Sequence, residues 1–139
     1  MVSHYWGRQL PGEWWWISAN QFNRPDVAVE CSVFRSRVWG LPVKVPLAYL
    51  YLRIAGSRRL LISPPVLAQA TGSPERFDVH IRPLGKKPIT LKATGRDYGD
   101  LGDSISNTLI GDLEIYQGNQ LIARADGTAG LERRAPRAR

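Results

Sequence analysis

Aromatic and amide side chains recur at every second position in one stretch near the start of the chain. Residues 4–22 hold four of the five tryptophans. Side chains two residues apart in an extended strand point to the same face. The residues with this spacing are Trp14, Trp16, Ser18, Asn20 and Phe22. Aromatic faces stabilise a cation by roughly 0.5 to 2 kcal/mol per ring, and an amide can hold a hydroxyl group. The spacing therefore predicts a face that binds a hydrophobic ligand, with packing in the core or at a barrel end as the alternative.

The same stretch carries a family resemblance. Trp6-Gly7-Arg8 and Pro11 precede the tryptophan strand, and the whole pattern resembles the motif that opens the second half of tocopherol cyclases, which close the chromanol ring of vitamin E. Two later segments, Arg96-Asp97 and Ile110 to Tyr116, resemble the Arg-Asp and Tyr-Gly-Glu-Leu segments near the end of that family. The resemblance implies a lipocalin-like fold and cofactor-free cyclisation of a prenylated quinol.

The resemblance also implies a partner. Family members carry an additional amino-terminal half, whereas Met1 lies only a few residues before the motif in this chain. We therefore expect any cyclase activity to require a second copy, as a homodimer, or a separate partner that supplies the amino-terminal half. The ligand-binding residues predicted for the hydrophobic prenylated molecule are Trp6, Arg8, Trp14, Trp16, Asn20 and Phe22.

The reaction of that family needs a proton donor. Protonation of the alkene develops a tertiary carbocation, and a carboxylic acid in an apolar pocket can supply the proton because burial keeps it neutral. We assign this role to Asp97, with Arg96 steadying an oxygen of the head group. The alternative is an Arg96–Asp97 ion pair that braces the loop, since a neighbouring arginine lowers the pKa of a carboxyl group. Glu30 is a candidate only if its strand faces opposite to our assignment.

The sequence contains no motif typical of other common kinds of catalytic site. His4, His80 and the single cysteine, Cys31, are too scattered for a zinc site. The chain has no nucleophile elbow, phosphate-binding loop or dinucleotide-binding motif. We therefore expect neither a metal nor a cofactor. The competing function is a non-catalytic, lipocalin-like carrier of a lipid or pigment.

Of the formal charge of +7, the basic end of the chain contributes +3 and the remaining residues +4. Residues 132–139 hold four arginines and one glutamate, and the remaining cations are scattered singly or in pairs. We do not expect a nucleic-acid partner, although basic residues suit peripheral contact with anionic lipids, at roughly 1 kcal/mol each. The most apolar window, residues 43–54, is shorter than the roughly 20 residues that span a bilayer. With no secretory signal evident, the expected location is cytoplasmic.

Alternating apolar and polar residues predict strands throughout the 139 residues. The eight predicted strands cover residues 14–22, 26–34, 47–54, 59–63, 76–82, 89–94, 109–116 and 120–125. Short loops between them favour an antiparallel meander that closes around one small ligand. The prediction is therefore an all-β, antiparallel, eight-stranded lipocalin-like barrel or half-barrel.

Three details of this fold are open to direct comparison with a structure. A short turn at residues 23–25 predicts that Val29, Cys31 and Val33 lie beside Asn20, Ser18 and Trp16. Residues 66–73 allow a turn of helix, and residues 95–108 are predicted to be a long loop. The single β domain is expected to cover residues 1–131, followed by a basic, disordered tail at residues 132–139.

Overall fold

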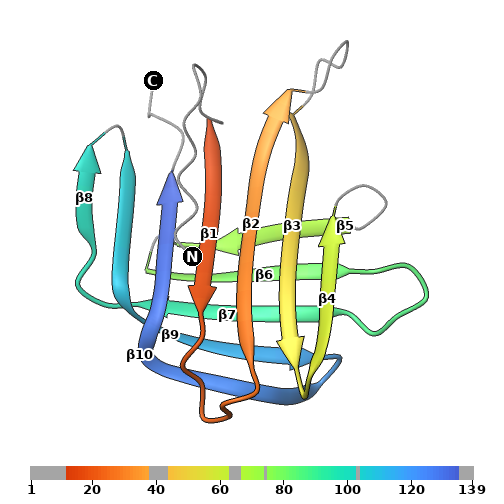
Figure 1. Cartoon of the computed structure of the whole chain (residues 1–139). Helices are drawn as coiled ribbons and strands as arrows, with labels where there is room; N and C mark the ends of the chain where they lie inside the picture. Colours follow the sequence, from red (N-terminus) through yellow and green to blue (C-terminus); the bar gives the residue numbers. More distant parts are fainter. Residues whose placement is uncertain (1–11, 38–43, 63–66, 74, 103, 135–139) are drawn as a thin grey trace.

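The computed structural model describes residues 12–37, 44–62, 67–73, 75–102 and 104–134. These residues form ten strands (Figure 1), and they include no helix long and apolar enough to cross a membrane. In chain order the strands are β1 (Glu13–Ala19), β2 (Ala28–Arg37), β3 (Lys44–Ile54), β4 (Ser57–Ile62), β5 (Leu67–Gly72), β6 (Arg76–Arg82), β7 (Ile89–Gly95), β8 (Gly99–Gly102), β9 (Ile105–Gln117) and β10 (Gln120–Arg134).

The strands make one antiparallel sheet that folds over into a half-barrel. Nine of them follow the order β4-β3-β2-β1-β10-β9-β7-β6-β5, and β8 pairs with β9 outside that path. In Figure 1, β1 to β4 run across the direction of β5, β6 and β7, whereas β9 and β10 bend and belong to both layers. Register shifts between Ala125 and Leu131 mark the bend in β10, as expected for β-bulges.

The all-β, antiparallel class is confirmed, but the number of strands was wrong. Residues 67–72, expected to allow a helical turn, form β5 because pairing with β6 outweighs the weak helical preference of their alanines. Part of the predicted loop at residues 95–108 forms β8 and the start of β9. The strand β10 reaches Arg134 and pairs with β1, so residues 132–134 are not a disordered tail.

The inner face of the half-barrel is filled by aliphatic side chains. Buried and less buried residues alternate along β1 and β6, and over residues 28–34 of β2, 47–53 of β3, 89–94 of β7 and 111–116 of β9. The largest fully buried side chains are Phe77, Ile17, Leu50, Ile81, Ile89, Leu91, Leu113, Ile115, Leu131, Val27, Val33 and Val79. Cys31 lies in this core as a free thiol, and burial raises its pKa.

The predicted register between the first two strands was wrong by one residue. Val33 lies opposite Trp15, Cys31 opposite Ile17 and Val29 opposite Ala19. The reason is the connection: β1 ends at Ala19 and β2 begins at Ala28, so eight residues join them instead of a short turn. A shift of one residue moves a whole strand's side chains to the opposite face.

Candidate ligand-binding face

The corrected register places Trp14 and Trp16 on the outer side of the half-barrel. Trp15 and Ile17 are 3% and 0% exposed in the core, whereas Trp14 and Trp16 alternate with them and remain partly exposed. The expectation that Trp14 and Trp16 line the interior of a barrel was therefore wrong, because the alternation of β1 points them away from it.

Strand pairing extends this outer side into a continuous row of aromatic and acidic residues. Trp14 lies opposite Phe34 of β2, and Trp16 shares a row with Tyr49 of β3. We call this surface the tryptophan face. Its residues are Trp14, Trp16, Glu30, Phe34, Tyr49, Tyr51, Leu60, Ile62, Leu109 and Glu132. Its two margins are strongly exposed, with Ile62 at 56% and Leu109 at 75%.

The position of Trp16 depends on a glycine in the neighbouring strand. Gly130 of β10 lies beside the Trp16 indole, and a Cβ atom at Gly130 would be 3.2 Å from Cζ3 of Trp16 and 3.5 Å from Cδ2 of Leu109. The absence of a side chain lets the indole lie flat over the strand. The ring and Leu109 in turn cover the backbone of Gly130.

Trp14 is held by a carboxylate on the neighbouring strand β10. Its Nε1 donates a hydrogen bond of 2.8 Å to Oε1 of Glu132. The guanidinium of Arg134 lies over the indole, 5.2 Å from the ring centroid, within the range of a cation–π interaction. The Trp14 ring is thus oriented by a carboxylate at its edge and a cation at its face.

A second carboxylate lies on the tryptophan face. Glu30 is opposite Ser18 of β1 and Tyr51 of β3, and its Oε1 accepts a 3.0 Å hydrogen bond from the Tyr49 hydroxyl. The strand of Glu30 faces as predicted, with Val29, Cys31 and Val33 in the core, so the stated condition is not met. Glu30 shares the outer face of Trp16 because β1, and not β2, has the opposite orientation to the one expected. Sequence reasoning missed Tyr49 and Glu132, since the pairing of β2 with β3 and of β1 with β10 brings them to this face.

The other predicted ligand-binding residues do not extend this face. Asn20 is exposed in the connection after β1, and Phe22 packs against the buried core. The prediction that they continue the row of Trp14 and Trp16 was wrong, because the strand ends at Ala19. Trp6 and Arg8 lie outside the described residues.

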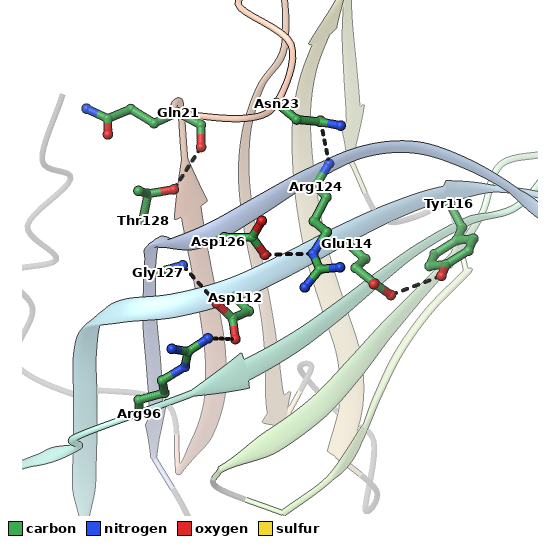
Figure 2. Close-up of polar contacts among 10 residues, drawn as sticks. All are labelled: Gln21, Asn23, Arg96, Asp112, Glu114, Tyr116, Arg124, Asp126, Gly127 and Thr128. Atoms are coloured by element: carbon green, nitrogen blue, oxygen red, sulfur yellow. Dashed lines mark hydrogen bonds and ion pairs between the residues drawn. The ribbon is translucent and has the colours of Figure 1, made fainter.

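Arg96 makes an ion pair with Asp112, and not with Asp97, the partner that the sequence offered. Its Nη2 donates to Oδ2 of Asp112, and the other Asp112 oxygen accepts a 2.8 Å hydrogen bond from the Gly127 amide (Figure 2). The hydrogen bond from Arg96, followed by the amide of Gly127, lowers the pKa of Asp112, partly offset by desolvation. This ion pair joins the two late segments that carry the family resemblance and braces the bend of β10.

Asp97 occupies an exposed turn with a φ of 49°, in the left-handed region. A proton donor of the expected kind needs apolar surroundings that keep it neutral. The exposed position of Asp97 does not supply them. Of the two acid candidates from the sequence, Glu30 is therefore the one that lies among aromatic rings.

The inner side of β1 also has polar groups around it, near Trp15 at the start of the strand. The Trp15 ring lies between the guanidiniums of Arg35 and Arg133, each 5.7 Å from its centroid. Within the described part of the chain, Trp15 Nε1, Arg133 Nε and the Tyr98 hydroxyl are buried without a hydrogen-bond partner. Burial, with a contribution from Glu75, raises the pKa of Tyr98 to about 12.

No group of histidine, cysteine and carboxylate side chains in the described ranges could hold a metal ion. The candidate site consists instead of aromatic rings, aliphatic side chains and two carboxylates that accept hydrogen bonds from aromatic residues. Such a surface can bind an apolar molecule, contact a hydroxyl group and stabilise positive charge.

Comparison with known proteins places this architecture in a class of β half-barrels. No family model matches the sequence, and no curated protein matches it. A solved structure resembles it, that of kievitone hydratase from Nectria haematococca, whose fold is tocopherol-cyclase-like. The TM-score is 0.50 and the sequence identity is 11%. The match covers 91% of this chain but only 40% of the hydratase chain. The likeness therefore concerns the fold of one part of a longer protein.

Proposed function

We propose that this chain binds a hydrophobic, alkene-bearing molecule with a hydroxyl-bearing head group, such as a prenylated quinol, on the tryptophan face. The observation that carries the proposal is the presence of Glu30 among Trp16, Tyr49 and Tyr51 on one side of the sheet. The motif resemblance to tocopherol cyclases and the fold likeness to a hydratase support the same class of ligand.

The proposed reaction is proton-initiated ring closure without a cofactor. Glu30, in its protonated form, donates a proton to the alkene, and the faces of Trp14 and Trp16 stabilise the carbocation that develops. The phenolic oxygen of the head group then attacks the cation and loses its proton. Acid-catalysed addition of water to an alkene, as the word hydratase implies, begins with the same protonation.

The tryptophan face is open to solvent at its margins, so the proposed site needs a cover. A second copy of the chain or a separate partner would exclude water from the face. An apolar cover favours the neutral, proton-donating form of a carboxyl group and strengthens the interaction between a cation and an aromatic ring. Ring closure therefore depends on the assembled form.

A non-catalytic carrier is the second candidate function. It is favoured by the hydrogen bonds from Trp14 to Glu132 and from Tyr49 to Glu30, because both carboxylates of the face already accept hydrogen bonds from aromatic side chains. A carrier would bind the same molecule on the same face and release it unchanged.

The first test is native mass spectrometry of the protein with a prenylated benzoquinol, followed by an assay for the chromanol product. We expect a ligand-bound dimer or a complex with a partner, and product formation that is lost in Glu30→Gln. Turnover that survives in Glu30→Gln but is lost in Asp97→Asn would return the acid role to Asp97. Binding without turnover would identify a carrier, and the absence of binding would refute both functions.

A further inference from the structure

A cavity separate from the tryptophan face lies where the β3–β4 turn approaches the ends of β9 and β10 (Figure 1). Its volume is about 250 Å³. The lining residues are Arg24, Leu52, Ile54, Ala55, Ser57, Arg59, Gln117 and Ile122. Leu52 belongs to the buried core, and Ile54 and Ile122 pack against that core while remaining partly exposed. The floor of the cavity is thus apolar and continuous with the interior of the half-barrel.

One side of the rim is fixed by a carboxylate. Asp26 receives hydrogen bonds from Arg24 through Nε at 3.1 Å and Nη2 at 2.7 Å, and it also accepts a 2.9 Å bond from the Ala55 amide. Ala55 has a φ of 49°, which is costly for a residue with a Cβ atom and occurs often at ligand-binding sites. Asp26 therefore holds both the Arg24 guanidinium and the β3–β4 turn at the cavity.

The other side of the rim carries an unpaired cation. Arg59 is opposite Leu52, on the inner face of β4, and its side chain makes no ion pair or hydrogen bond with any residue in the described ranges. Gln117 also lines an adjoining, more open hollow, to which Lys87 contributes a further positive charge. Arg59 thus lies at an opening above an apolar floor, with Lys87 in the adjoining hollow, while the charge of Arg24 is balanced by Asp26.

We propose that this cavity is a second binding site, for a small amphiphile that carries an anionic group such as a carboxylate. The apolar body lies against Ile54 and Ile122, and the anionic group lies beside Arg59. The Arg59 guanidinium favours a carboxylate, because it offers paired donors in a planar arrangement. The charge of Arg24 is balanced by Asp26, but its remaining N–H groups are offered from a position that Asp26 has already fixed, so little freedom is lost on binding.

The size of the cavity limits the ligand. A volume of 250 Å³ holds about eight non-hydrogen atoms, if each takes up roughly the 30 Å³ of a water molecule. This is smaller than the usual site for a drug-sized molecule. An eight-carbon acid such as octanoate matches both the volume and the charge of the site, with its carbon atoms in the cavity and its two carboxylate oxygens at the rim beside Arg59.

Titration with octanoate, followed by NMR of the backbone amides, tests the proposal. We expect saturable shifts of the Ala55 and Gln117 amides, and about tenfold weaker affinity in Arg59→Gln. Arg58→Gln is the matched control, since Arg58 is the adjacent residue but pairs with Arg53 on the outer face. It removes the same charge and should leave the affinity unchanged. Octanol, which lacks the charge, should bind at least tenfold more weakly than octanoate.

Equal losses of affinity in Arg59→Gln and Arg58→Gln would overturn the proposal, because they would indicate general attraction to a basic surface. Equal affinity for octanol would also overturn it. Binding to phosphatidylglycerol vesicles without any response to octanoate would assign the cations to a membrane surface instead. No tryptophan of the described ranges lines the cavity, so binding of a prenylated quinol followed by tryptophan fluorescence reports separately on the proposed function.

Discussion

On one side of β1, Trp15 and Ile17 are buried, and on the other side Trp14 and Trp16 are partly open to solvent. The residue types alone do not distinguish the two sides, since both carry indoles. Their neighbours distinguish the two sides. The inner side lies beside Val33 and Cys31, whereas the outer side lies beside Phe34, carboxylates and a tyrosine.

This difference separates stability from binding within one strand. The inner side contributes free energy of folding through burial of apolar area, at about 25 cal/mol per Å². The outer side has less to lose from substitution, because its side chains are only partly buried. If this division is right, single substitutions on the two sides should affect different measurements.

The largest effect is expected from the inner side. Ile17→Ala removes a fully buried side chain and should lower the free energy of unfolding by about 2 to 5 kcal/mol, measured by urea denaturation. Ser18→Ala, on the outer side of the same strand, is the control and should change it by less than about 0.5 kcal/mol. Similar values for the two variants would contradict the division between the faces.

Two glycines, Gly111 and Gly130, give a second test of the difference between the inner and outer sides. A Cβ atom at Gly111 would lie 2.7 Å from Cδ1 of Leu131 and 2.8 Å from the carbonyl oxygen of Ala129, on the crowded inner side. Gly111→Ala should therefore destabilise the protein by about 1 to 3 kcal/mol in thermal or urea unfolding. Gly130→Ala meets only the half-exposed ring of Trp16, which can tilt, so it should cost less than about 1 kcal/mol. The opposite order would show that the outer face is the more rigid one.

Trp16→Ala tests the outer side directly. Because the indole is partly exposed, we expect a loss of about 1 to 2 kcal/mol in stability. We also expect at least a tenfold loss of affinity for a prenylated quinol, measured by quenching of the remaining tryptophans. Comparable losses of stability and affinity, expressed as free energies, would instead identify Trp16 as a structural residue.

The smallest effect concerns the ion pair at the bend of β10. Arg96 and the Gly127 amide lower the pKa of Asp112 in the folded protein, so its contribution to stability is present above the unfolded value of about 4. It is lost as the pH falls through the lower, folded pKa. The stability difference between the wild type and Asp112→Asn should thus be constant from pH 7 to pH 5 and shrink below pH 4. A difference that persists at pH 2.5 would contradict this assignment.

Local alternation was enough to predict β6 and β7, whose buried and exposed positions follow the sequence residue by residue. It was not enough for the connection between β1 and β2. There the Asn23 side chain and amide bond to the backbone of Arg124, and the Gln21 carbonyl accepts a bond from Thr128 (Figure 2). These contacts with β10 keep residues 20–23 out of β1 and change the register between β1 and β2.

The candidate site shows the same limit. The spacing of Trp14 and Trp16 correctly indicated that they share a face, but which face depends on a register that is fixed by long-range contacts. The partner of Arg96 lies 16 residues away, across a sheet pairing with no local signature. Glu30 could be named only conditionally, because its orientation follows from that register.

The pairing of β1 with β10 also determines the order in which the chain can fold. Trp14 and its hydrogen-bond partner Glu132 are 118 residues apart, so during synthesis β1 has a neighbour on one side only until the last strand has been made. An aromatic strand with an unpaired edge is prone to associate with other chains. Contacts at such separation slow folding to milliseconds or longer. The tryptophan strand is thus the part of the nascent chain that most needs shielding by a chaperone.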